Sequence, residues 1–269
     1  MLGQVGWTQD AYEAYSRLFV QALVPFPCVL GIVALGSTAD PLLRDVWSDH
    51  DFAIVLHQAD PEQFLSDVEW MPHAARIVGH ARHGGIYNTV VYDDGHKVEY
   101  VVSNDTSAAA LLVTRFAMLL DRGEIKGRIE EAHARTLARQ KSTADQASTP
   151  VNLAIVLLTA THRLERGEAV SAMSFVSLAL DIALHLLAHD GTCAEGVLAD
   201  PLDPRRRIEF SQPAVARGLA AILASPPDAA VARLIQFADD VVRPRAPTRD
   251  WPAFDRIIAT LGPRTRPKG

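Results

Sequence analysis

Three acidic side chains and a Gly-Ser turn are the residues of this 269-residue chain whose types and spacing could do chemistry. Gly36 and Ser37 end an apolar stretch, and Asp49 and Asp51 follow Ser37 just before the chain becomes apolar again. Side chains at i and i+2 on a strand share a face, so these two carboxylates repel unless a cation lies between them. A hard divalent ion such as Mg2+ prefers oxygen ligands and commonly arrives with substrate phosphates. The turn could supply backbone N–H groups and a hydroxyl for such phosphates.

A third carboxylate, Glu99, lies inside a segment rich in Val and Tyr. Residues 87–92 and 97–102 are separated by Asp93-Asp94-Gly95-His96, and Asp-Gly is a strong turn signal, so the pattern predicts a β-hairpin. A carboxylate in an apolar strand is costly unless something binds it, and Glu99 is therefore a candidate binding residue.

The elements that must position these residues follow from periodicity and from capping residues. Thr8 is a plausible N-cap for a helix that ends before Pro25 and Pro27. The other expected elements are strands over 29–35 and 51–56, a short helix over 38–44, and helices over 61–70 and 106–120.

The remainder of the chain reads as helical only, because apolar residues recur at three and four positions. We place a domain junction in the small, polar stretch 142–150, which gives a first domain over 1–145 and a second over 146–269. The predicted fold class is α+β, a small mixed sheet followed by an all-α bundle. Its helices are expected over 151–165, 169–188, 212–224, 228–242 and 251–261.

Composition excludes several classes of function. Apolar residues make up 48% of the chain and charged residues 22%, which is typical of a globular protein with a core. The net charge of −6 argues against wrapping a long nucleic acid and favours a small acceptor. Two isolated cysteines, Cys28 and Cys193, make no disulfide framework, and no signal peptide or membrane span is evident. We therefore expect a cytoplasmic protein with no membrane partner.

The order apolar strand, Gly36-Ser37, a gap, Asp49-x-Asp51 and a second strand resembles the nucleotidyltransferase superfamily typified by DNA polymerase beta. The likeness is closer to its lincosamide and aminoglycoside nucleotidyltransferase branch, in which a helical domain follows the catalytic one. That family usually has an apolar residue between the two aspartates, and here it is His50, which a partly exposed back face would tolerate.

The resemblance implies one or two Mg2+ ions held by Asp49, Asp51 and Glu99, and an NTP co-substrate, most simply ATP, whose outer phosphates Gly36 and Ser37 hold. Glu99 would be either a metal ligand or the general base. The implied reaction transfers a nucleoside monophosphate to a hydroxyl of a small molecule such as an antibiotic. Related enzymes often pair, so a homodimer is also expected.

Other polar residues carry a structural and a functional interpretation. Arg206, in an Arg triplet, reads as a solvated helix start or as a phosphate contact. The acidic and histidine side chains of the helical half either form structural pairs or bind the acceptor: Glu165, Glu168, Asp181 and His185. The histidines at 73, 80, 83 and 96 lack a zinc-ligand spacing and favour ordinary surface or hydrogen-bonded roles.

Three alternatives remain open. The chain could modify a protein or an RNA, as toxin–antitoxin members of this superfamily do. It could be an inactive homologue that binds nucleotide, or an α/β interaction protein whose Asp-x-Asp is accidental.

Overall fold

The computed structural model describes residues 7–57, 60–147, 149–188 and 203–261. The chain divides into two compact units, Met1–Leu137 and Ala138–Gly269. The division falls inside one helix, α4 (Ile125–Ala147), whereas the sequence suggests a junction at about residue 145. Neither glycine nor proline follows Gly127 until Pro150, so no residue stops the helix earlier.

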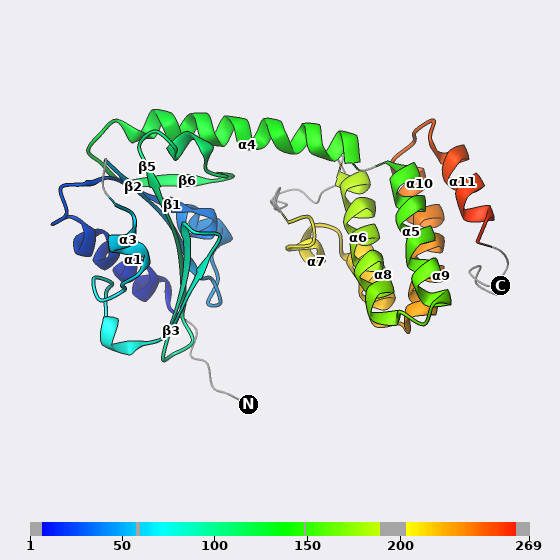
Figure 1. The fold of residues 1–269 in the computed structure, drawn as a ribbon, viewed down its shortest axis with the longest axis horizontal. Coiled ribbons are helices and arrows are strands. Elements are labelled where there is room, and N and C mark those ends of the chain that lie inside the picture. The colour runs from blue at the N-terminus through cyan, green and yellow to red at the C-terminus, as the bar shows by residue number, and fades with distance from the viewer. Residues whose placement is uncertain (1–6, 58–59, 148, 189–202, 262–269) are drawn as a thin grey trace. The chain divides into compact units, whose positions relative to one another are not determined.

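The first unit contains a six-stranded mixed sheet, in agreement with the predicted fold class (Figure 1). The strand order is β3-β4-β5-β2-β1-β6; β2 and β5 are parallel, and the other neighbours are antiparallel. The strands are β1 (Val29–Leu35), β2 (His50–Leu56), β3 (Ile77–His83), β4 (Tyr87–Tyr92), β5 (Lys97–Asn104) and β6 (Phe116–Asp121).

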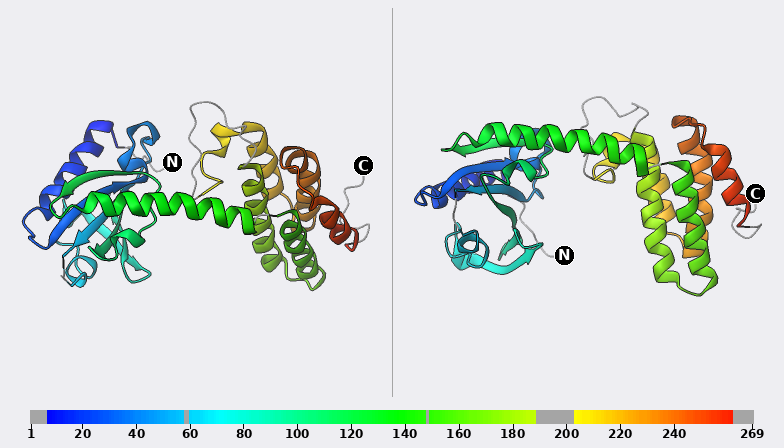
Figure 2. Two further views of the ribbon diagram at one scale, coloured as in Figure 1. Left: turned by 90° about the horizontal axis from the view of Figure 1, so that it is seen from above. Right: turned by 45° about the horizontal axis from the view of Figure 1, so that its top comes forward.

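Helices cover both faces of this sheet, as Figures 1 and 2 show. Alternate residues of the central strands belong to two separate cores. Phe52 and Ile54 of β2 pack with α1 (Gln9–Leu23) and α3 (Glu62–Leu65), while Ala53 packs with the first part of α4. The Thr8 hydroxyl accepts from the Ala11 N–H, which confirms the predicted N-cap. The central strands are therefore buried on both faces.

Several expected elements differ in the structure. The helix predicted over 106–120 is wrong: the segment forms a short 3-10 helix, η3 (Ala108–Ala110), and then β6. Ala, Met and Leu favour helices, but β6 pairs with the free edge of β1, and this long-range pairing outweighs local propensity. The helix expected over 61–70 shrinks to α3, and the one over 38–44 becomes α2 (Gly36–Ala39) and η1 (Pro41–Leu43).

The second unit is helical, as predicted, and its core joins most of its helices. Its elements are α5 (Pro150–Glu165), α6 (Ala169–Ala188), α7 (Ile208–Ser211), α8 (Pro213–Leu223), α9 (Pro227–Phe237), the π-helix η4 (Ala238–Val242), α10 (Arg243–Arg245) and α11 (Trp251–Ala259). Helix α6 is the one described helix long and apolar enough to cross a membrane, yet half of its most apolar window is buried inside the protein. Its buried residues from Val176 onward belong to the core of this unit, which is a common position for such a helix.

Candidate metal and phosphate site

Strand register brings the three predicted carboxylates together. In the parallel pair β2–β5, Asp51 lies opposite Glu99 and His50 lies opposite Val98. Asp49 directly precedes β2 and shares the strand face of Asp51, two positions away. One carboxylate oxygen from each of Asp49, Asp51 and Glu99 lies within 4.8 Å of the others, and all three side chains are partly buried. Three anions this close need a compensating positive charge.

Lys97 supplies a positive charge at this cluster. Its Nζ lies 2.8 Å from Asp49 Oδ2 and 2.9 Å from Glu99 Oε1. Partial burial would lower the pKa of Lys97, but the two carboxylates outweigh it and raise that pKa. The lysine side chain is 40% exposed, so solvent reaches the bridge it forms.

Glu99 is held by its neighbours on the sheet. The Tyr87 hydroxyl donates to Oε2 at 2.6 Å, and the Thr89 hydroxyl donates to Oε1 at 3.3 Å. Partial burial alone would raise the pKa of Glu99, but the hydrogen bonds from Tyr87 and Lys97 outweigh it and lower the pKa. The carboxylate is therefore ionised at neutral pH and oriented by three donors.

The Gly-Ser turn lies against the second carboxylate. Gly36 has φ +53°, a left-handed conformation that favours glycine, and a Cβ there would be 3.4 Å from Asp51 Oδ2. The Ser37 side chain is buried, and its hydroxyl has no hydrogen-bond partner among the described residues. Buried hydroxyl groups normally form hydrogen bonds, and a bound ligand would provide the partner that the Ser37 hydroxyl lacks.

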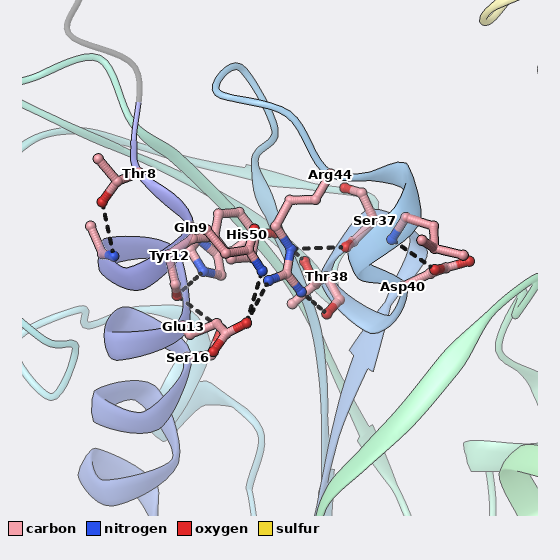
Figure 3. A network of polar contacts seen from close by, with 12 residues as sticks. Thr8, Gln9, Tyr12, Glu13, Ser16, Ser37, Thr38, Asp40, Arg44 and His50 are labelled. Carbon is pink, nitrogen blue, oxygen red and sulfur yellow. Dashed lines mark hydrogen bonds and ion pairs between the residues drawn. The ribbon is translucent and has the colours of Figure 1, made fainter.

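A chain of hydroxyl groups sets the position of the Asp-x-Asp segment. Figure 3 shows two of its members, Tyr12 and Thr38, beside His50. The Asp51 N–H donates to Thr38 Oγ1 at 2.8 Å, and Thr38 Oγ1 lies 2.8 Å from the Tyr12 hydroxyl. Tyr12 in turn donates to the Asp49 carbonyl at 2.5 Å. Because each hydroxyl has one proton, Thr38 must donate to Tyr12. Helix α1 and the Gly-Ser turn thus hold the backbone on both sides of His50.

His50, which the sequence suggests is partly exposed, is in fact fully buried. Its Nε2 lies 3.0 Å from the Tyr12 carbonyl, which can only accept, so Nε2 carries the proton. Nδ1 then accepts from His96 Nε2 at 2.7 Å. The ring also stacks on Tyr12, with ring centroids 3.6 Å apart. A histidine is accommodated at this position because α1 and the hairpin turn together satisfy both of its nitrogens.

The buried His50–His96 pair predicts acid sensitivity. Burial lowers the pKa of His50 to about 2 and that of His96 to about 4, both below the usual value near 6.5. The unfolded chain therefore binds more protons below pH 6.5, and stability falls as pH drops from 6.5 towards 4. For the two histidines together, the slope of the unfolding free energy against pH approaches about 2.7 kcal/mol per pH unit, twice the value for a single group.

Urea unfolding between pH 7.5 and 4.5 measures this loss. Carboxylates also titrate at the acid end, so the informative comparison is between variants. His96→Gln should lower the slope by about one proton, whereas His80→Gln, at an exposed histidine of β3, should leave it unchanged. Equal slopes in all three proteins would contradict the assignment.

The donor set fits a hard divalent cation. Three carboxylates lie within reach of one ion, and the Gly36 turn lies beside one of them. Within the described ranges, this is the one cluster of at least three His, Cys, Asp or Glu residues that could hold a metal ion. The histidines at 73, 80 and 83 do not form such a cluster.

The remaining predicted site residues lie in the helical unit. Arg206 is in the turn before α7, where its N–H donates to the Asp203 carbonyl. Asp181 accepts from Arg205 at 2.6 Å, and Arg163 pairs with Glu168 at 2.7 Å. His185 Nδ1 lies 2.7 Å from the Asp181 carbonyl rather than its carboxylate. Glu165 is exposed at the end of α5.

The residues that hold the carboxylates were not evident from sequence. Lys97 is the exception, because it lies two positions before Glu99 and the i, i+2 rule places both side chains on one strand face. Tyr87 is a hairpin residue of the kind the pattern predicts, but its contact with Glu99 depends on the register of β4 and β5. Thr38 and Tyr12 carry no local signal, because their partners lie 13 and 37 positions away in sequence.

Comparisons with solved structures return proteins of low similarity. A nucleotidyltransferase-like protein from Exiguobacterium sibiricum is 15% identical, with 86% of this chain and 76% of that chain covered and a TM-score of 0.34. An aminoglycoside 6-adenyltransferase from Bacillus subtilis is 11% identical, with 93% and 97% covered and a TM-score of 0.35. The CD-NTase CdnG from Bradyrhizobium diazoefficiens, solved with GTP, is 14% identical, with 94% and 92% covered and a TM-score of 0.29.

No protein-family model matches the sequence, and no curated protein matches it either. The activity of the chain is inferred from the geometry of its three carboxylates.

Proposed function

We propose that this chain transfers a nucleoside monophosphate from an NTP, most simply ATP, to a hydroxyl group of a small molecule. The observation that carries the proposal is the placement of Asp49, Asp51 and Glu99 within 4.8 Å of one another, beside the left-handed Gly36 turn. A cation site of carboxylates next to a turn that can receive phosphate suits a metal-bound triphosphate.

Asp49, Asp51 and Glu99 would hold one or two Mg2+ ions, which would offset charge on the triphosphate oxygens during transfer. Gly36 and Ser37 would hold the outer phosphates, with the unpartnered Ser37 hydroxyl as a donor. In the overall reaction, the acceptor oxygen bonds to the α-phosphorus and its hydroxyl proton is lost to solvent. The bond from that phosphorus to the bridging oxygen breaks, which releases pyrophosphate. Such in-line transfer needs positioning more than covalent help, so no protein nucleophile is required.

The surroundings of Glu99 favour one of its two possible roles. The hydroxyl groups of Tyr87 and Thr89 donate to its two oxygens and orient the carboxylate, which suits an anionic metal ligand. We therefore assign Glu99 to the metal rather than to proton abstraction.

Two measurements test the function: the melting temperature of the protein with metal and nucleotide, and the formation of product. A ligand that binds the native state raises its melting temperature, so Mg2+ with ATP or GTP should do so, and EDTA should cancel the effect. Incubation with α-labelled NTP and a panel of small acceptors, including lincosamides and aminoglycosides, should then give labelled acceptor and pyrophosphate. Absence of any magnesium-dependent shift would overturn the proposal, and a shift without product would indicate an inactive nucleotide-binding protein.

A macromolecular acceptor is the alternative, and the same labelled nucleotide decides it. Label that moves onto a protein or an RNA instead of a small molecule would indicate the toxin–antitoxin type of activity. The net charge of −6 favours the small acceptor. An antibiotic acceptor, a cytoplasmic location and a homodimer remain part of this proposal.

The acceptor contacts are proposed to come from the helical unit, with Glu165, Glu168, Asp181 and His185 as polar candidates and Arg206 as a phosphate contact. Asp181 is partly exposed and already oriented by Arg205. Asp181→Asn should raise the acceptor KM with the nucleotide KM nearly unchanged, because a uniform binding contact is removed. A change confined to the nucleotide KM would contradict this assignment.

A further inference from the structure

Lys97 compensates part of the negative charge of the carboxylate cluster in the structure. Its ammonium lies within 2.9 Å of oxygens from two of the three carboxylates, Asp49 and Glu99. A lysine ammonium and a metal ion cannot share the same carboxylate lone pairs without strong mutual repulsion. This inference rests on the proposed function, in which a divalent ion binds the same carboxylates as Lys97.

The local geometry allows the ammonium to leave. Lys97 is 40% exposed, its four-carbon stem is flexible, and both of its bonds go to side chains rather than to the backbone. Glu99, by contrast, also accepts hydrogen bonds from Tyr87 and Thr89, which lie on the neighbouring strand β4. The cluster therefore has one movable cation and a carboxylate that other residues hold in place.

We propose that Lys97 is an exchangeable counter-cation: it holds the carboxylate cluster together in the metal-free protein, and a divalent ion must displace it to bind. The lysine is thus a positioning residue that lowers the affinity of the site for free metal. Without it, the three carboxylates repel one another until metal arrives, so the empty site is less stable and the metal-bound site forms more readily.

Binding of Mn2+ alone, without nucleotide, tests the proposal. The full-length protein and its variants are titrated with Mn2+ by calorimetry or by paramagnetic resonance of the free ion. Lys97→Met should bind Mn2+ about tenfold tighter than the wild type, which corresponds to about 1.4 kcal/mol. Lys97→Arg keeps a cation at the same position and should not gain affinity. Lys126→Met is the matched control, because Lys126 also pairs with a carboxylate, that of Glu130 at 3.8 Å, but outside the cluster.

A second measurement covers the case in which Lys97→Met folds poorly. In EDTA its melting temperature should lie below that of the wild type, and saturating Mn2+ should close the difference. Lys97→Gln provides a smaller polar replacement for the same comparison.

The outcomes separate this inference from the proposed function. If the wild type binds Mn2+ and Lys97→Met binds it within twofold of the same affinity, Lys97 is a static ion pair and the inference is wrong. If neither protein binds Mn2+, the metal-dependent function itself fails. Mn2+ binding that is measurable only in Lys97→Met supports the proposal, because Lys97 would then block the metal completely in the wild type.

Discussion

Replacing Asp49 and Asp51 by asparagine is expected to abolish magnesium-dependent nucleotidyl transfer while the protein stays folded. Asparagine keeps the shape of each side chain but removes the charge that would hold the metal, and the metal contributes several kcal/mol to such reactions. A fall of about 10³-fold or more in turnover is therefore expected. Turnover is measured as release of pyrophosphate or as transfer of labelled nucleotide.

Folding of the double variant is the necessary control. The substitutions relieve repulsion from Glu99 but also remove the Asp49 partner of Lys97, which lies at 2.8 Å. These effects oppose each other at a partly exposed site, so unfolding free energy without metal should change by no more than about 1 kcal/mol. Full activity in a folded double variant would refute the central proposal.

Glu99→Gln is expected to have the second largest effect. The amide keeps the size of the side chain but loses the negative charge, so turnover should fall by about 10²-fold or more. Nucleotide binding should fall less, because Asp49, Asp51 and the Gly-Ser turn remain. Steady-state kinetics with varied NTP and a separate nucleotide-binding titration distinguish the two effects.

The matched variant for this test is Tyr87→Phe, which removes the 2.6 Å hydrogen bond to Glu99 but leaves the carboxylate. A smaller loss than in Glu99→Gln is expected, because the ligand loses orientation but not charge. Unchanged turnover in Glu99→Gln would assign the third carboxylate elsewhere. The nearby candidates are less suitable: Asp93 and Asp94 pair with Arg76, and Asp105 lies 3.5 Å from His57.

Local pattern was sufficient for the parts of the site that lie on regular strands. A continuously apolar run predicts β1, and the Asp-Gly turn between two Val- and Tyr-rich segments predicts β4 and β5, as the structure has them. The alternation of a strand then accounts for the common face of Asp49 and Asp51. Pattern was insufficient for β6, where helix-favouring residues form an edge strand beside β1.

The burial of the His50 side chain could not be inferred from its residue type. A histidine between two aspartates reads as a solvent-facing residue, because burying it without partners is costly. Tyr12 and His96 provide those partners from elements 38 and 46 positions away in sequence. A single sequence carries no record of such a pairing, so residue type and local pattern wrongly predict that His50 is partly exposed.

What the sequence by itself determined is which residues are candidates for the chemistry and which strands carry them, because side-chain type and strand periodicity are local properties. Only the tertiary structure decided how those residues are compensated. The parallel register of β2 and β5 places Asp51 opposite Glu99, and the same register brings Lys97 to Asp49. Charge compensation depends on distances of a few ångströms between segments almost 50 residues apart, and such distances are set by packing of the whole sheet rather than by any local pattern.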